Sequence, residues 1–387
     1  MSKKIFIVSG GTGGHIIPAR CLAESLSNLN HRVFFFGDQK IKSYVNGNDK
    51  FSSHIIQSSQ LKKSIIFLAK ASLKIALGIL QSGYFLIRYR PDYLVAFGGY
   101  ASFGMLFASV VFKCPIILHE QNAHLGKVNR IFAKYATKIA TSFPQITGIK
   151  DGDLTKIIFT GNPVRSEIIA LNKIEYQIPH LKEEIANINN LKTGYDVILN
   201  SDFYEIVKTK EQINILVIGG SGGAKIFSEI LPKSFFNLNE NIKEKLQIIQ
   251  QCRLELVDST LKSYKDLNMN AVVSGFFNNM SELIREAHLV ICRSGSSTIA
   301  ECCIAKKPMI LVPFELSADN HQQKNAQYYQ ENGCAIIIKE QDFTINNVND
   351  KINQLLTSPQ TLVKMSQSCS KIANIEATNN LSKIVLS

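Results

Sequence analysis

The chain has 387 residues, of which 45% are hydrophobic and 19% charged, and its formal net charge is +12. This length exceeds what one hydrophobic core usually fills, so we expect two domains, and the composition argues against a disordered chain. The apolar run after the basic N-terminus ends at a glycine after four residues, and no stretch reaches 18 uncharged apolar residues. These features argue against a secretory signal and a transmembrane helix, so we expect the protein to stay in the cytoplasm.

The positive charge is concentrated in the first half of the chain. Residues 1–160 carry 20 Lys and Arg against 7 Asp and Glu, whereas residues 161–387 carry 23 against 24. Such asymmetry suggests that one domain faces a polyanion, either a nucleic acid or an anionic membrane surface. A general enrichment in lysine is the alternative that needs no ligand.

Short apolar runs alternate with longer amphipathic stretches along the chain. The runs are KIFIVS, HRVFFFGD, DYLVAFGG and PIILHE, followed by INILVIGG, LQIIQQC, AVVSGF, LVICRSG and PMILVPF. They predict buried parallel strands with helices between them. We therefore expect an α/β fold of two doubly wound halves, the second beginning after GNPVR at 161–165, with the active site in the cleft between them.

Three segments depart from this alternation. Residues 172–211 are polar and lack a clear period, which predicts a surface insertion near the domain boundary. Residues 61–90 combine an apolar face with six basic side chains, which suits a helix lying in a membrane interface, while an ordinary helix covering the sheet fits most of its length equally well. Residues 373–387 predict a terminal helix that packs back across the halves.

Two glycine-rich loops follow strands, SGGTGGHIIPA at 9–19 and GGSGGAK at 219–225. A strand, a glycine turn and a helix leave unpaired backbone N–H groups at the positive end of the helix dipole, and such a turn suits an anion. The second loop is not an ATPase loop, because Ala224 precedes the lysine and Ile226 replaces the magnesium-binding hydroxyl. The first is not a dinucleotide fingerprint, because Ile16 occupies the third glycine position.

A third candidate loop lies within residues 289–314, where we expect a strand to end at Arg293 and a helix to start near Thr298. Arg293 or the helix N-terminus could meet phosphate, and Glu301 could accept two hydrogen bonds from a ribose. The alternative is a capping box of Thr298 with Glu301 that needs no ligand.

Cysteines and acidic pairs give weak metal signals. The eight cysteines are scattered without a C-x-x-C pair, so we expect free thiols rather than a disulfide or a zinc site. Asp151 and Asp153 form a D-x-D sequence, which we expect to face solvent.

The chain carries, in order, SGGTGGHIIPA, VAFGGYAS, LHEQNAHLGKVNR, GNPVR, GGSGGA, CRSGSSTIAE and DNHQQ. With these motifs it resembles the MurG family of glycosyltransferases. The resemblance implies a GT-B fold, with an acceptor- and membrane-facing domain at 1–163 joined by the helix at about 373–387, and a domain at 164–372 that binds UDP-N-acetylglucosamine.

The resemblance also implies an activity. It is inverting transfer of N-acetylglucosamine from UDP to the 4-hydroxyl of undecaprenyl-pyrophosphoryl-N-acetylmuramyl-pentapeptide, the step from lipid I to lipid II in peptidoglycan synthesis. The implied location is peripheral, at the cytoplasmic face of the inner membrane. The implied partners are the donor, the lipid acceptor, an anionic membrane surface and other cell-wall synthesis proteins, with no cofactor and no nucleic acid.

The resemblance assigns His15 as the catalytic base, a role that a neutral imidazole suits, although His15 could instead position the acceptor. Glu301 is implied to bind the ribose, the backbone at Phe277 the uracil, and Gln322 with Gln323 the sugar hydroxyls. The other implied substrate contacts are Thr12, Gly13, Gly14 and Asn122 in the first half, and Arg165, Ser221, Ser296, Ser297 and Thr298 in the second. Helix N-termini and arginine can stabilise the departing UDP without a metal.

The chain departs from the family pattern at a few positions. Gly222 stands where the family has glutamine, Asn278 and Asn279 replace an acidic pair, and Ser296 and Ser297 replace the usual alanine and leucine. We expect altered donor affinity and retained activity.

Two other functions would fit parts of the sequence. A UDP-N-acetylglucosamine epimerase would share the architecture and the donor, but it would bring carboxylates to the sugar, and the motifs here offer mostly amides and hydroxyls. A nucleic-acid-binding protein would use the basic half, but the sequence has no recognition motif or stacking aromatic set.

Overall fold

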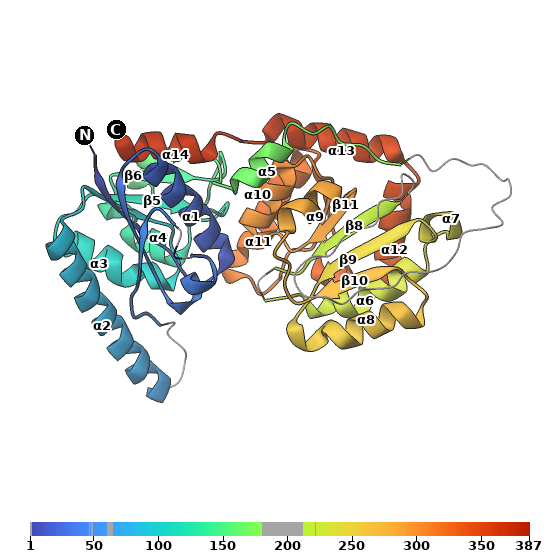
Figure 1. Cartoon of the computed structure of the whole chain (residues 1–387), viewed down its shortest axis with the longest axis horizontal. Helices are drawn as coiled ribbons and strands as arrows, with labels where there is room; N and C mark the ends of the chain where they lie inside the picture. Colours follow the sequence, from blue (N-terminus) through green and yellow to red (C-terminus); the bar gives the residue numbers. More distant parts are fainter. Residues whose placement is uncertain (1, 46, 48, 60–64, 180–211, 221) are drawn as a thin grey trace.

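The structure is a computed structural model, and it describes residues 2–45, 47, 49–59, 65–179, 212–220 and 222–387. Two parallel β-sheets lie side by side, each with helices on both faces (Figure 1). The first sheet has the strand order β3-β2-β1-β4-β5-β6-β7, and the second has the order β10-β9-β8-β11-β12-β13. The prediction of two doubly wound α/β halves is confirmed.

The first half contains residues from near the N-terminus to β7. Its strands are β1 (Lys4–Val8), β2 (Arg32–Gly37), β3 (Ser52–Ile55), β4 (Tyr93–Ala96), β5 (Ile116–Glu120), β6 (Lys138–Thr141) and β7 (Ile157–Phe159). Its helices are α1 (Gly13–Asn28), α2 (Ile65–Tyr89), α3 (Phe103–Val111) and α4 (Lys127–Phe132).

The second half follows the short helix α5 (Ser166–Leu171). Its strands are β8 (Ile213–Ile218), β9 (Leu246–Gln251), β10 (Ala271–Ser274), β11 (Leu289–Cys292), β12 (Met309–Leu311) and β13 (Ala335–Ile337). Its helices are α6 (Lys225–Phe236), α7 (Glu240–Lys243), α8 (Val257–Asp266), α9 (Met280–Glu286), α10 (Ser296–Ile304), α11 (His321–Glu331), α12 (Ile345–Leu356) and α13 (Pro359–Ile372), and the last helix is α14 (Ala377–Leu386).

The central strands are apolar along most of their length because both sheet faces are covered. In β1, Phe6 and Val8 point into one buried cluster, whereas Ile5 and Ile7 point into the cluster on the opposite face. This arrangement is typical of parallel sheets, whose carboxyl-end loops are then free to build a site.

Helix α14 returns to the first half, across the top of Figure 1. Leu381 and Val385 belong to the same buried cluster as Ile5, and Lys3 donates from Nζ to the carbonyl of Leu386 at 2.6 Å. A terminal helix was expected here. The division of the chain at residues 163 and 373 stays a prediction.

Helix α2 packs against α3 and projects beyond the sheet at the lower left of Figure 1. Ala71, Gly78 and Leu86 lie on its buried side. Gly78 lies so close to the preceding loop that a Cβ there would sit 2.0 Å from the Gln57 carbonyl oxygen. Among the described residues, no helix combines the length and apolar character needed to span a bilayer.

Two polar segments were expected at the surface, the D-x-D sequence at 151–153 and the insertion at 172–211. Asp153 is buried and its carboxylate accepts a hydrogen bond from Lys156 at 2.8 Å, so the expectation that the D-x-D sequence faces solvent is wrong for this residue. Of the insertion expected at 172–211, residues 180–211 lie outside the described residues.

Candidate active site between the two halves

The glycine loop after β1 leads into α1. Thr12 is the N-cap residue with φ −144°, and its hydroxyl makes no capping bond but lies 2.9 Å from His15 Nδ1. Gly11 has φ +87°, a conformation that favours glycine, and a Cβ on Gly13 would lie 2.7 Å from the Tyr44 hydroxyl. The first N–H groups of α1, at Gly13 and Gly14, are ones that a helix start leaves without a partner in the helix itself.

His15 lies in this first turn, near enough to His321 of the second half to be affected by its charge. Burial, and the charge of His321 to a smaller extent, lower the pKa of His15 to about 4. The imidazole is therefore neutral near pH 7. If Nδ1–H donates to the Thr12 hydroxyl oxygen, Nε2 is left as a proton acceptor.

The segment after β5 holds Asn122 in a defined orientation. Glu120 Oε1 accepts from the Asn122 backbone N at 3.0 Å and from Asn122 Nδ2 at 3.1 Å. Its other oxygen accepts from Gly126 N and Asn129 Nδ2 at 2.8 and 2.9 Å. Burial raises the pKa of Glu120 above its usual value, and these hydrogen bonds offset only part of the rise. Sequence analysis missed this residue, although it stands two positions before Asn122 in the HEQN motif.

Helix α10 provides the facing N-terminus. It begins at Ser296 with Gly295 as N-cap, and Ser296 and Ser297 are buried. The Ser297 hydroxyl donates to the Gly14 carbonyl oxygen at 3.0 Å, so the first turns of α10 and α1 meet. The expected start near Thr298 is wrong by two residues.

Glu301 does not form the capping box with Thr298 that was the ligand-free alternative. Its Oε1 accepts from Arg165 Nε at 2.8 Å and its Oε2 from Arg165 Nη2 at 2.7 Å. This bidentate pair joins the GNPVR segment to α10 and leaves carboxylate lone pairs for another donor.

The second glycine loop follows β8. Gly220 and Gly223 have φ of +76° and +61°, and a Cβ on Gly222 would meet no heavy atom within 4 Å among the described residues outside its chain neighbours. Ser221, the residue implied to approach the donor, lies outside the described residues. The Phe277 side chain is buried in the core of the second half.

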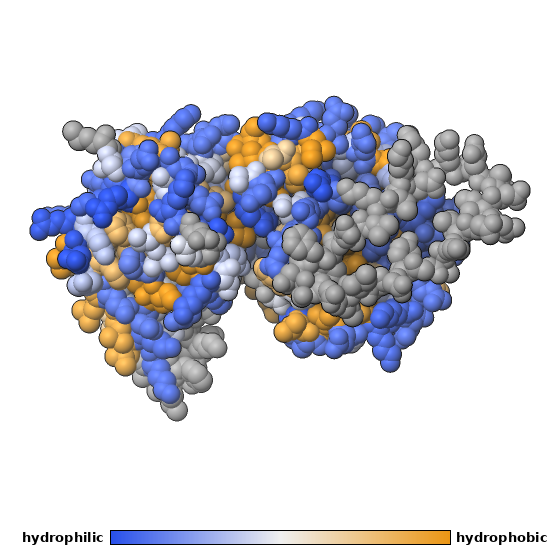
Figure 2. All heavy atoms as spheres, in the orientation of Figure 1, coloured by the Kyte–Doolittle hydropathy of each residue, from blue (hydrophilic) through white to orange (hydrophobic). Residues whose placement is uncertain are grey.

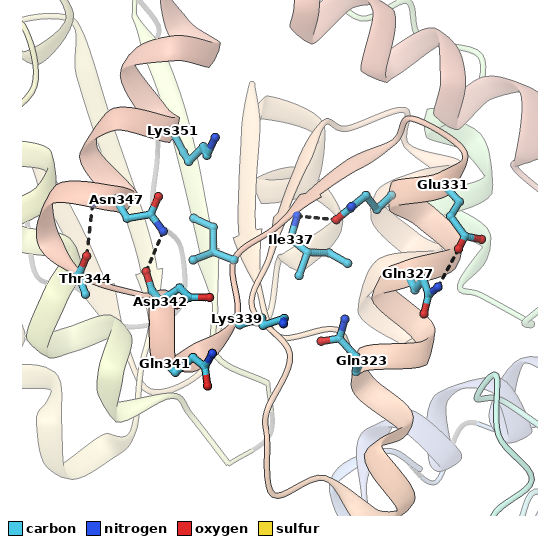
Figure 3. Close-up of a pocket in the computed structure, with 12 residues that line it drawn as sticks. Gln323, Gln327, Glu331, Ile337, Lys339, Gln341, Asp342, Thr344, Asn347 and Lys351 are labelled. Carbon is cyan, nitrogen blue, oxygen red and sulfur yellow. Dashed lines mark hydrogen bonds between the residues drawn. The ribbon is translucent and has the colours of Figure 1, made fainter.

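Helix α11 carries Gln322 and Gln323. Gln322 Oε1 accepts from the Phe314 backbone N at 2.9 Å, which holds the loop before α11. Gln323 lines a cavity of about 750 Å³ between α11, β13 and α12 (Figure 3). Arg293, one of two candidates for meeting phosphate, instead pairs with Glu340 at 2.6 Å and is buried, which leaves the N-terminus of α10 for that role.

Three cysteines that are far apart in the sequence come together behind α10. The ligand sulfur atoms of Cys303, Cys334 and Cys369 all lie within 4.8 Å of one another, and all three residues are buried. Thiolates suit soft metal ions, but hydrogen bonding to the neighbouring cysteines raises the pKa of Cys303 and of Cys369, which favours the thiol forms of these two. This cluster could not be predicted from sequence spacing, because its members come from α10, the loop before β13 and α13.

The chain is similar to known glycosyltransferases over nearly its whole length. Residues 5–141 match the N-terminal domain of glycosyltransferase family 28, and residues 214–380 match its C-terminal domain. A curated relative from Rhodospirillum centenum is a UDP-N-acetylglucosamine–N-acetylmuramyl-(pentapeptide) pyrophosphoryl-undecaprenol N-acetylglucosamine transferase. It is 33% identical over 382 residues, which cover 99% of this chain and 93% of the relative.

Solved structures share the fold. The crystal structure of Acinetobacter baumannii MurG has a TM-score of 0.71 at 23% identity and covers 99% of both chains. A UDP-N-acetylglucosamine 2-epimerase has a TM-score of 0.62 at 14% identity, covering 100% of this chain and 96% of the epimerase. Because both classes share this fold, the fold alone does not separate transfer from epimerisation.

Proposed function

The chain belongs to the UDP-N-acetylglucosamine–N-acetylmuramyl-(pentapeptide) pyrophosphoryl-undecaprenol N-acetylglucosamine transferases, the MurG family, and from this premise we propose how its cleft performs the reaction. The reaction transfers N-acetylglucosamine from UDP-N-acetylglucosamine to the 4-hydroxyl of the N-acetylmuramyl residue, which converts lipid I to lipid II. The observation that carries the proposal is the meeting of two helix N-termini, one from each half, at the Ser297–Gly14 hydrogen bond.

The donor binds to the second half in this proposal. The N-terminus of α10 faces the UDP diphosphate with its backbone N–H groups, that of Ser297 included, and with the hydroxyls of Ser296 and Thr298, as the helix dipole favours. Glu301, held by Arg165, accepts from the ribose hydroxyls. Stabilising the charge that develops on the leaving UDP is the main contribution of these groups to the rate.

The acceptor binds to the first half. The amides of Gly13 and Gly14 at the start of α1 face its pyrophosphate, and Asn122 completes the substrate site from the first half. His15 Nε2 takes the proton from the attacking 4-hydroxyl, while Thr12 holds Nδ1. The hydroxyl oxygen attacks the anomeric carbon as the bond to UDP breaks, so the configuration inverts.

The exposed side of α2 is the proposed membrane-binding surface. Leu73, Leu80 and Tyr84 are 63%, 70% and 59% exposed, and Leu77 and Ile87 complete a stripe at helical spacing. Figure 2 shows apolar side chains beside hydrophilic ones along this projecting part of the first half. Exposed basic residues flank the stripe, namely Lys70, Lys74, Arg88 and Arg90. Apolar side chains would enter the lipid and the basic ones would meet anionic headgroups, at about 1 kcal/mol each.

The transfer reaction is tested with radiolabelled UDP-N-acetylglucosamine and a short-chain analogue of the lipid acceptor. We expect wild type and the exposed control Glu331→Ala to form labelled product. His15→Ala should lose turnover and keep UDP binding, whereas Glu301→Ala should lose UDP binding. A wild-type protein that forms no product would refute the proposal.

Membrane binding is tested separately by co-sedimentation with phosphatidylglycerol vesicles. Leu77→Gln with Leu80→Gln should release the protein from vesicles. The matched control is Leu254→Gln in the second half, where the leucine is 81% exposed, and it should bind like wild type. Raising the salt concentration should weaken the binding of wild type and of Leu254→Gln to the vesicles. Equal binding by all three proteins would exclude α2 as the contact.

A further inference from the structure

Cys303, Cys334 and Cys369 form a three-cysteine cluster in the core of the second half, away from the proposed active site. Their Sγ atoms all lie within 4.8 Å of one another, and the three residues are 2%, 0% and 0% exposed. They come from α10, the loop before β13 and α13, so only the fold brings them together. The three sulfur atoms are thus placed to reach one central atom.

The geometry of the cluster suits a centre with three sulfur ligands. A bond of about 2.3 Å, the length of a zinc–thiolate bond, puts three sulfur atoms around one atom about 4 Å apart. The sulfur atoms here need to move by less than about 1 Å to reach that spacing. Within the described part of the chain, no His, Asp or Glu joins the group, whereas structural zinc sites normally take four ligands.

The surroundings of the cluster favour a complex without net charge. Phe143 and Tyr329 belong to the same buried cluster of side chains, and burial raises the pKa of Tyr329, which keeps its hydroxyl neutral. Outside the cluster, the thiols donate only to backbone carbonyl oxygens, namely those of Lys307, Asn332 and Cys369. A buried charge without an opposite charge is costly. A trivalent centre neutralises three thiolates, whereas a monovalent or divalent ion would leave negative charge in the core.

A small cavity between the halves reaches Cys303. It has a volume of about 30 Å³, and residues 161–162 and 373–374, where the chain passes between the halves, contribute to its lining. Asn162 in its wall is 6% exposed, and neither polar atom of its carboxamide has a hydrogen-bond partner among the described residues. The hydroxyl of Ser142, also in the wall, has none either. Such buried polar groups suit a small molecule that carries hydroxyls.

We propose that the three-cysteine cluster is a binding site for trivalent arsenic, or for a metalloid of the same valence and chemistry, held by three bonds to sulfur. The ligand enters as arsenous acid, which is small, uncharged and hydroxylated. The final complex is neutral, as the apolar surroundings require.

The binding reaction exchanges oxygen for sulfur and transfers no electrons. Hydrogen bonds from Cys303 and Cys369 lower the pKa of Cys334, so that a thiolate is present for the first attack. At each step one As–S bond forms and one As–O bond breaks. The leaving hydroxide takes a proton from the attacking thiol at Cys303 and Cys369, and from solvent at Cys334. Three water molecules leave and arsenic stays trivalent.

The neighbour of Cys303 in α10 provides a matched control. Cys302 is as buried as the three cysteines, but its sulfur is not part of the cluster. Adjacent cysteines could bind arsenic as a pair, and such a site would need Cys302. Replacing Cys302 therefore separates binding at the cluster from binding at the adjacent pair.

The test incubates the reduced full-length protein with sodium arsenite and measures the adduct by native mass spectrometry. Wild type and Cys302→Ala should each gain the mass of one arsenic atom less three hydrogens. Cys303→Ala and Cys369→Ala should bind at least about tenfold more weakly, because each loses one of three chelating bonds. Near-ultraviolet circular dichroism shows whether each variant keeps its folded core.

X-ray absorption at the arsenic edge tests the wild-type adduct without any substitution. It should show three sulfur neighbours and no oxygen. The inference would be overturned by wild type that binds no arsenic, or by an oxygen neighbour in its adduct. Unchanged binding in Cys303→Ala would also overturn it, as would lost binding in Cys302→Ala.

Discussion

At the scale of single residues, the Arg165–Glu301 pair combines stability with substrate binding. The Glu301 side chain is 6% exposed and that of Arg165 33% exposed. Arg165→Ala leaves a buried carboxylate without its partner, so we expect the free energy of unfolding to fall by about 2–3 kcal/mol, less than for a fully buried pair. Urea unfolding measures this loss.

The matched control for this prediction is the double variant. Glu301→Gln removes the charge that needs the guanidinium, so Arg165→Ala should destabilise a Glu301→Gln protein much less than wild type. Equal losses in the two backgrounds would contradict the pairing.

The sequence predicted which segments carry site residues better than it predicted their partners. Thr12 and His15 could be placed at a helix start from the sequence, because the strand, the glycine turn and the helix follow one another within a few residues. The Arg165–Glu301 pair joins residues 136 positions apart, and the Asn325–Asn122 contact joins residues 203 apart. Such pairs depend on how segments far apart in the chain pack together in the fold. This packing cannot be predicted from the spacing of residues in a single sequence.

At the scale of elements, a substitution at the N-terminus of α10 should change ligand affinity without changing stability. Gly295 has φ −67°, and among the described residues no heavy atom outside its chain neighbours lies within 4 Å of the place that a Cβ would take there. Gly295→Ala should therefore change the free energy of unfolding by less than about 0.5 kcal/mol. The added methyl group would occupy the space that phosphate needs, so we expect the Kd for UDP to rise about tenfold by calorimetry.

The control for this prediction is Gly152→Ala, in another position with open space around it. It should leave both stability and UDP affinity unchanged. An unaltered UDP affinity in Gly295→Ala would argue that the phosphate lies elsewhere.

At one glycine of α2, packing predicts a loss of stability on substitution by alanine, whereas helix propensity predicts a gain. Alanine in place of a helix glycine usually stabilises by roughly 0.5–1 kcal/mol. At Gly78, however, the Cβ would lie 2.0 Å from the Gln57 carbonyl oxygen, so we expect Gly78→Ala to destabilise by about 1–3 kcal/mol in urea unfolding. Ala76→Ser, at an exposed position of the same helix, should have little effect.

Strand prediction succeeded where the sequence contains a continuous apolar run. All nine predicted apolar runs contain strands, and the structure adds β3, β6, β7 and β13. Each of these has three or four residues, and β3, β7 and β13 are at sheet edges. Short strands at an edge need fewer apolar residues, so their sequences lack the continuous runs that identify the central strands.

At the scale of the whole molecule, both halves bury neutral histidines. Burial is the largest cause that lowers the pKa to about 4 for His15, His119 and His288. The His288 ring accepts a hydrogen bond from the Asn214 backbone N at 2.8 Å, which requires a neutral ring nitrogen. In the unfolded chain the pKa of each returns to about 6.5.

This difference sets a direction for acid unfolding. Between pH about 6.5 and about 4 the unfolded chain binds protons at these histidines that the folded chain does not. Their neutral burial therefore lowers the free energy of unfolding progressively as the pH falls through this window, and it has no such effect above about pH 6.5. Each histidine contributes a slope of up to about 1.4 kcal/mol per pH unit. We expect urea unfolding at pH 7.5, 6 and 5 to show this fall, and His288→Gln to reduce the slope by about one proton. A slope that is unchanged in His288→Gln would mean that this ring is already protonated in the folded protein.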